Sequence, residues 1–270
     1  MTKRTKGGNR YAQLIERIFE RHYQLGQDIL EFERAEIIEV AQELGIELPL
    51  NLGDVLYSFK YRANLPVSIT ERAPEGKEWV IANRGRSKYA FVAKVAARIL
   101  PDSMLTYTKI PDATPGIVEM HSFDDEQALL TKLRYNRLLD IFTGVTCYSL
   151  QNHLRTTVPG VGQVETDEVY VGVDRRGQHY VFPVQAKGGT DELGVVQIEQ
   201  DIALCQHKFP ALTCRAIAAQ FMKGSIIALF EFELVDGEIR KLAERHYSLV
   251  PAEEVGAEDL LKYAERPDLA

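Results

Sequence analysis

The stretch that decides the fold is QVETDEVYVGVDRRGQHYVFPVQAK, residues 163–187. Two runs rich in β-branched and aromatic residues flank a short polar turn that ends in glycine, which is typical of a β-hairpin. If residues 175–177 form a three-residue turn with its glycine in the left-handed conformation, the numbers of paired residues add up to 352. This register predicts that Asp167 lies opposite Gln185, with the two Cβ atoms about 5 Å apart.

Because side chains alternate along a strand, Gln185 and Lys187 share one face of the hairpin, and the register adds Asp167 to that face. The opposite face of the second strand suits a core and consists of Tyr180, Phe182, Val184 and Ala186. A carboxylate, an amide and an ammonium group are costly to bury together without a purpose. A Mg²⁺ site would explain why these groups lie together, since Mg²⁺ takes oxygen ligands, polarises a phosphodiester and lowers the pKa of a bound water. A lysine beside it orients the attacking water or stabilises the transition state.

These residues resemble the PD-(D/E)XK nuclease superfamily, whose restriction-endonuclease-like fold places an aspartate on one strand and a (D/E)xK triplet on the next. The run from Gly162 to Asp167, GQVETD, is similar to the opening of Holliday-junction resolvases. Gln185-Ala-Lys187 resembles the QxK variant of Mrr-like restriction nucleases. The resemblance covers roughly residues 124–235. It implies that Asp167 and Gln185 ligate Mg²⁺, with Mn²⁺ as a substitute, and that Lys187 serves the attacking water.

Three further residues complete the predicted site. A glutamine at position 185 supplies no charge, so a second carboxylate is expected from Glu165 on the same strand face or from Glu126 on the preceding helix. Gln197, on the helix after the hairpin, is similar to the glutamine that RecB-like members place near their site.

A simpler interpretation of the hairpin is a cross-strand ion pair between Asp167 and Lys187. Glu168 is expected to face solvent. Pro183 cannot donate a hydrogen bond to a neighbouring strand, which favours a β-bulge beside the site.

Charge is distributed unevenly over the 270 residues, whose net charge is −7. Between residues 60 and 98 there are nine basic residues and three acidic ones. A phosphate backbone responds to such a local patch, so the acidic total does not exclude DNA. The predicted DNA contacts in this segment are Lys60, Arg62, Arg84, Arg86 and Lys88.

Other features exclude several classes of protein. No apolar run reaches the length of about 18 residues that a membrane span needs. The three cysteines form no CxxC pair, which favours a reducing cytoplasm over a disulfide framework or a zinc site. The absence of GxSxG, P-loop and GxGxxG motifs gives no support for a serine hydrolase or for use of ATP or NAD.

The predicted fold class is α/β (α+β), a restriction-endonuclease-like mixed sheet flanked by helices and preceded by a helical unit. Residues 1–66 form that unit, with helices at 10–24, 29–45 and 52–61. Gly45 ends the second helix and Asn51 caps the third, in a pattern that resembles a helix-turn-helix. Residues 67–120 form a basic β-containing segment, 121–250 the nuclease core and 251–270 an acidic tail.

Within the core, an amphipathic helix over 124–141 buries Leu129, Leu130, Leu133, Leu138 and Leu139. A second helix is expected at 193–207, and strands at 145–151, 163–173, 179–187, 212–221 and 226–235. We therefore expect a Mg²⁺-dependent endonuclease of double-stranded DNA, a homodimer that acts in restriction or defence. One alternative is a non-catalytic DNA-binding regulator with a degenerate nuclease domain. Another is a protein-interaction module with an ion-paired hairpin.

Overall fold

The computed structural model describes residues 11–61, 63–95, 98–122, 126–188 and 191–266. They form two compact units. The first comprises the described residues of 1–99, 156–164 and 194–200, and the second comprises those of 100–155, 165–193 and 201–270. The two-residue strands β4 (Arg98–Ile99) and β9 (Leu193–Gly194) lie where the chain passes from one unit to the other. These limits differ from the predicted boundaries at residues 66 and 120.

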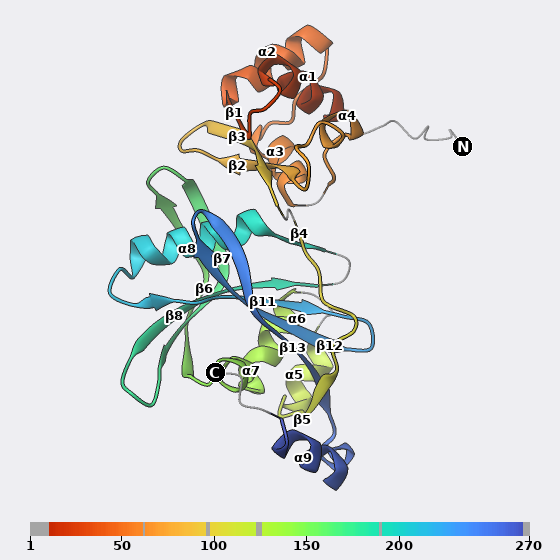
Figure 1. Ribbon diagram of the computed structural model, residues 1–270, viewed down its shortest axis with the longest axis vertical. Helices are drawn as coiled ribbons and strands as arrows, with labels where there is room; N and C mark the ends of the chain where they lie inside the picture. The colour runs from red at the N-terminus through yellow and green to blue at the C-terminus, as the bar shows by residue number, and fades with distance from the viewer. Residues whose placement is uncertain (1–10, 62, 96–97, 123–125, 189–190, 267–270) are drawn as a thin grey trace, which may run out of the picture. The chain divides into compact units, whose positions relative to one another are not determined.

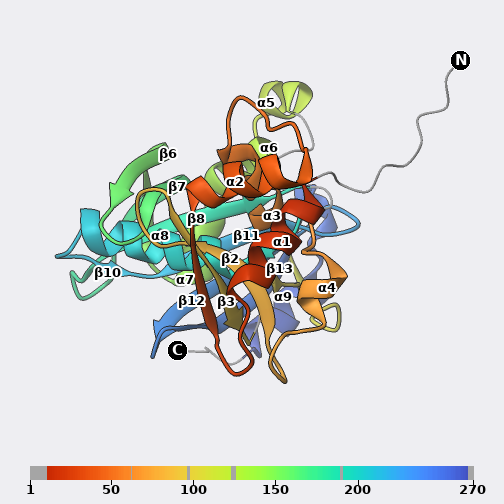
Figure 2. The same ribbon diagram turned by 90° about the horizontal axis from the view of Figure 1, so that it is seen from above.

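The first unit combines four helices with a three-stranded antiparallel sheet of order β1–β3–β2 (Figure 1, Figure 2). The helices are α1 (Ala12–His22), α2 (Arg34–Leu44), α3 (Gly53–Tyr61) and α4 (Val67–Thr70). The strands are β1 (Ile29–Glu33), β2 (Glu78–Asn83) and β3 (Lys88–Lys94). One core joins them and includes Phe19, Ile37 and Phe91. The prediction that β2 and β3 belong to a separate segment is therefore wrong, because they pack with the helices.

The predicted helix over 29–45 begins only at Arg34, because residues 29–33 form β1 and pair with β3. Their burial alternates, with Leu30 and Phe32 inside, as expected for a strand that has one face in a core. The backbone N–H of Glu33 donates to the Glu36 side chain at 2.8 Å, which starts α2 with a capping box.

The turn between α2 and α3 is longer than that of a helix-turn-helix. Gly45 ends α2 in the left-handed conformation, with φ of 64°, as predicted. The Oδ1 atom of Asn51 accepts a hydrogen bond from the backbone N–H of Gly53 at 3.1 Å, at the predicted start of α3. Residues 45–52 separate the two helices, whereas a helix-turn-helix has a turn of three or four residues. The sequence pattern was therefore correct about the helix ends, and the helix-turn-helix stays a prediction, with a turn longer than the motif usually has.

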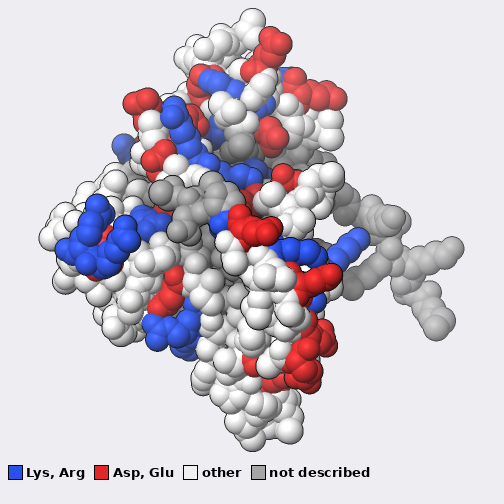
Figure 3. Space-filling view, turned by 60° about the horizontal axis from the view of Figure 1, so that its bottom comes forward, with Lys and Arg blue, Asp and Glu red and all other residues white. Residues whose placement is uncertain are grey.

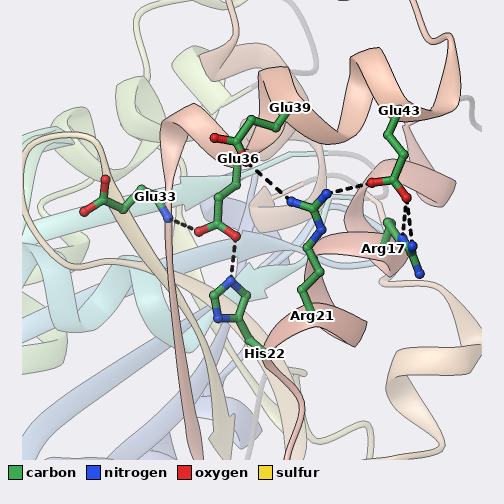
Figure 4. Close-up of polar contacts among 7 residues, drawn as sticks. All are labelled: Arg17, Arg21, His22, Glu33, Glu36, Glu39 and Glu43. Carbon is green, nitrogen blue, oxygen red and sulfur yellow. Dashed lines mark hydrogen bonds and ion pairs between the residues drawn. The ribbon is translucent and has the colours of Figure 1, made fainter.

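Ion pairs join α1 to α2 (Figure 4). Arg17 and Arg21 both donate to Glu43, at 2.7 and 2.6 Å, and His22 lies 2.6 Å from Glu36. The two arginines of α1 are thus engaged by glutamates of the same unit.

The second unit contains a mixed sheet with the strand order β5–β13–β12–β11–β8–β7–β6, in which β10 also pairs with β8. Strand β8 is antiparallel to β7 and parallel to β11. The strands are β5 (Tyr107–Pro111), β6 (Thr146–Val158), β7 (Gly162–Val173), β8 (His179–Lys187), β10 (Thr213–Cys214), β11 (Ala216–Phe221), β12 (Ile226–Val235) and β13 (Glu238–Val250). The helices are α5 (Gly116–His121), α6 (Glu126–Tyr135), α7 (Leu138–Thr143), α8 (Val195–Lys208), the 3₁₀ helix η1 (Ala252–Glu254) and α9 (Ala257–Ala264).

The predicted helix over 124–141 is two helices, α6 and α7, and its first two residues lie outside the described ranges. The break falls at Asn136, whose amide donates to the backbone oxygen of Lys132 at 3.0 Å, and at Arg137, which has a φ of 49°. All five leucines predicted to face the core are buried there. The core beneath them contains Phe182, Val184 and Ala186, the predicted apolar face of β8.

Pro183 interrupts the pairing of β8 with its parallel neighbour. Residues 180–181 pair with 213–214, and residues 184–187 pair with 217–220, at the same offset on both sides of the gap. Because the register does not change, Pro183 occupies a gap in the hydrogen bonding rather than the expected bulge. No helix in the described ranges is both long and apolar enough to cross a membrane.

Candidate functional site

The β7–β8 hairpin has the predicted register. Glu168 pairs with Val184 and Tyr170 with Phe182, so the numbers of each pair add up to 352. Gly177 has a φ of 81°, the left-handed turn conformation expected from the sequence. The ladder ends at Glu168 and Val184, one position before Asp167 and Gln185.

Asp167 continues the connection between the strands with its side chain. Its Oδ2 atom accepts a hydrogen bond from the backbone N–H of Ala186 at 2.9 Å. Burial raises the pKa of Asp167, the Ala186 N–H and the Lys187 charge oppose this shift, and Glu126 adds to it. A half-buried carboxylate of this kind gains from a nearby cation, which favours its charged form.

Lys187 forms an ion pair with Glu126 on α6, with 2.9 Å between Nζ and Oε1. The two side chains are 12% and 38% exposed. Glu126 was one of the two residues expected to supply a second carboxylate. The structure brings it to the motif, but its contact is with Lys187. The same ammonium group lies close enough to Asp167 to lower its pKa.

Gln185 contacts Asp201 on α8, a residue that the sequence interpretation did not assign to the site. The Nε2 atom of Gln185 donates to Oδ1 of Asp201 at 3.3 Å, and both side chains are buried. Burial raises the pKa of Asp201 well above its usual value; the Gln185 amide opposes this shift, and Asp167 adds to it. The signal that could have found Asp201 is an acidic residue on an otherwise largely buried segment of α8.

The fit of these residues to Mg²⁺ depends on how many protein ligands the cation needs. In the described ranges, no three Asp, Glu, His or Cys side chains converge closely enough to hold a metal ion. The site offers the carboxylate of Asp167 and the amide of Gln185, and the buried Oδ2 atom of Asp201 has no hydrogen-bond partner among the described residues. Mg²⁺ is often held by one or two carboxylates with waters and substrate phosphates. The donor set therefore fits a Mg²⁺ bound largely by water and substrate.

The two other acidic residues of β7 are held by ion pairs. Glu165 is exposed and pairs with Arg155, and its Oε1 atom lies 3.5 Å from Nδ1 of His153. Glu168 is fully buried, so the prediction that it faces solvent is wrong. Its Oε1 atom accepts from Arg134 at 2.8 Å and from the hydroxyl of Ser149. The register places Glu168 with Val184 on the core side, and Arg134 of α6 reaches it there.

The predicted DNA contacts belong to the first unit. Arg84, Arg86 and Lys88 are exposed at the β2–β3 turn, which we call the basic turn. Lys60 is half-buried instead, donates to Oδ1 of Asn83 and lies 4.7 Å from the centre of the Tyr89 ring. Burial lowers the pKa of Lys60 to about 8.

Two predicted residues remain. Arg62 lies outside the described residues. Gln197 belongs to the part of α8 in the first unit, where its Oε1 atom accepts from the N–H of Gly194 at 3.4 Å. This contact caps the start of its own helix.

On the face drawn in Figure 3, the Lys and Arg side chains form several separate groups, with Asp and Glu side chains between them.

Compared with family models, with curated proteins and with solved structures, the chain has no match in any of the three.

Proposed function

We propose that this chain is a Mg²⁺-dependent endonuclease that hydrolyses phosphodiester bonds of double-stranded DNA, with Mn²⁺ as a substitute. The observation that carries the proposal is the grouping of Asp167, Gln185 and Lys187 at the open end of the β7–β8 hairpin. Perturbed carboxylates gathered around a lysine are typical of functional sites. An ordinary cross-strand ion pair would leave the buried contacts of Gln185 and Asp201 without a purpose.

The order of elements in the second unit supports the proposal. A helical segment, α6 and α7, precedes three strands that are neighbours in the sheet, β6, β7 and β8. Helix α8 then leads to β11, which is parallel to β8. This order is the one expected of a restriction-endonuclease-like core, with the motif residues on its second and third strands.

The chain's own residues divide the work of the proposed reaction. Asp167 and the amide oxygen of Gln185 would hold Mg²⁺, which would supply polarisation of the phosphodiester and a lower pKa for the attacking water. Lys187 orients the attacking water and stabilises the negative charge that grows on the phosphate oxygens. Glu126 keeps the ammonium group of Lys187 in place until the substrate phosphate arrives.

The first unit is suited to hold the duplex. Its elements run in the order helix, strand, three helices and hairpin, with β1 beside β3. The exposed basic turn joins the two strands of a ribbon, and the major groove of B-DNA admits a ribbon of that size. Its contacts would go mainly to phosphates, which position the protein without selecting a sequence.

The direct test is cleavage of supercoiled plasmid with Mg²⁺, with Mn²⁺ and with EDTA. We expect cleavage in both metals, none in EDTA and none in Asp167→Asn. Glu165→Gln is the matched control, because it removes an acidic residue of the same strand that is already paired with Arg155. A wild-type protein that binds DNA but never cuts it, over varied and modified substrates, would instead be a non-catalytic regulator.

A further inference from the structure

Asp201 is a deeply buried acidic side chain at the candidate site, with 1% of its surface exposed. It contacts the motif through the hydrogen bond from Nε2 of Gln185 to its Oδ1 atom. Its second oxygen, Oδ2, is buried and has no hydrogen-bond partner among the described residues. An unsatisfied buried oxygen is costly in a purely structural pair, so the arrangement calls for another explanation.

The hydrogen bond fixes the orientation of the Gln185 amide. Its NH₂ group donates to Oδ1 of Asp201 and therefore faces it. The amide oxygen then points away from Asp201. Without Asp201, the amide could rotate and present its NH₂ group, which cannot bind a metal ion.

We propose that Asp201 is a positioning residue that holds the NH₂ group of Gln185, so that the amide oxygen faces the metal ion. This inference rests on the proposed function, because it assumes that a divalent cation binds beside Asp167. It predicts that the acid and the amide can exchange places between β8 and α8.

The test uses the full-length protein and three variants: Asp201→Asn, Gln185→Glu, and the two changes together. Binding of Mg²⁺ alone is measured by calorimetry, and cleavage of plasmid is measured as a function of Mg²⁺ concentration. Asp201→Asn should weaken Mg²⁺ binding 10- to 100-fold, the usual effect of removing a partner that orients a ligand. It should move the Mg²⁺ midpoint of cleavage in parallel.

Gln185→Glu alone brings two carboxylates into hydrogen-bond distance in a buried place, so it should lower the melting temperature of the metal-free protein. The double variant restores one acid and one amide, in exchanged positions. It should recover both the melting temperature and most of the Mg²⁺ affinity. A merely structural role for Asp201 predicts recovery of the melting temperature without recovery of Mg²⁺ affinity.

Asp236→Asn is the matched control, because it makes the same chemical change in an exposed turn. Wild-type levels of Mg²⁺ affinity and cleavage midpoint in Asp201→Asn would overturn the inference and leave the proposed function intact. A wild-type protein that neither binds Mg²⁺ or Mn²⁺ nor cuts DNA would overturn both. The two failures are therefore distinguishable.

Discussion

Replacing Lys187 by alanine separates a catalytic lysine from one that only stabilises the fold. The ion pair of Lys187 with Glu126 is partly exposed, so its loss should cost about 1 kcal/mol or less in the free energy of unfolding. An electrostatic group used in the transition state contributes more, and its removal typically slows a reaction by about 10²–10³, or about 3–4 kcal/mol. The rate should therefore fall far more than the stability does.

The rate is best measured as single-turnover cleavage of plasmid at saturating Mg²⁺, with DNA binding and urea unfolding followed on the same preparations. DNA affinity should stay within about threefold of the wild type, because the lysine acts mainly in the transition state. Glu126→Gln is the control, since it breaks the same ion pair and keeps the ammonium group. It should lose similar stability and, because only the placement of the ammonium group is affected, slow cleavage much less than Lys187→Ala does. A Lys187→Ala protein that cuts DNA within threefold of the wild-type rate would refute the reasoning.

Three other predictions concern DNA binding, pH and packing. Charge reversal of all three residues of the basic turn should weaken DNA binding and reduce the slope of log affinity against log salt by about 3. The melting temperature should not change. An unchanged slope would show that this turn does not contact DNA. Burial raises the pKa of Asp167 in the metal-free folded protein. Above about pH 4 this protein therefore binds more protons than the unfolded chain does, so its free energy of unfolding should fall as the pH rises from there through the folded-state pKa. Asp167→Asn should flatten that dependence in urea titrations, and an unaltered profile would contradict the shift. Gly172→Ala should destabilise the fold by about 1–3 kcal/mol, because a Cβ atom there would lie 2.8 Å from Val145, whereas Gly116→Ala has open space and should be nearly neutral.

The sequence predicted the hairpin well because its signals are local. The polar turn, the left-handed Gly177 and the alternation along both strands together determine which residues pair. The same kind of signal was present at Asp236-Gly237, a two-residue turn that favours a hairpin, and β13 pairs with β12 across it. That strand was missed because its sequence, EIRKLAERHYSLV, is polar and lacks a clear alternation.

The rest of the candidate site depends on contacts between residues far apart in the sequence. The contact of Asp201 with Gln185 follows from no local pattern, whereas the core-side position of Glu168 follows from the register and only its partner, Arg134, does not. Asp201 meets Gln185 because α8 packs on the face of β8 opposite to the leucines of α6. Glu168 is buried because the register places it with Val184, and a charged residue on a core face is tolerated only with a partner such as Arg134. Such partners become visible only when helices and sheet are assembled.

The alternation of β8 also limits which changes in chain length the site can survive. Along the strand, Val184 and Ala186 are fully buried on one side, and Gln185 and Lys187 lie on the other. A single residue inserted between Val181 and Val184, if it joined the strand, would turn every later side chain to the opposite face. The lysine would then enter the core, and alanine would take its place at the site. Insertion of two residues would keep each side chain on its face, so the tolerance of this strand to insertions should depend on whether their number is odd or even.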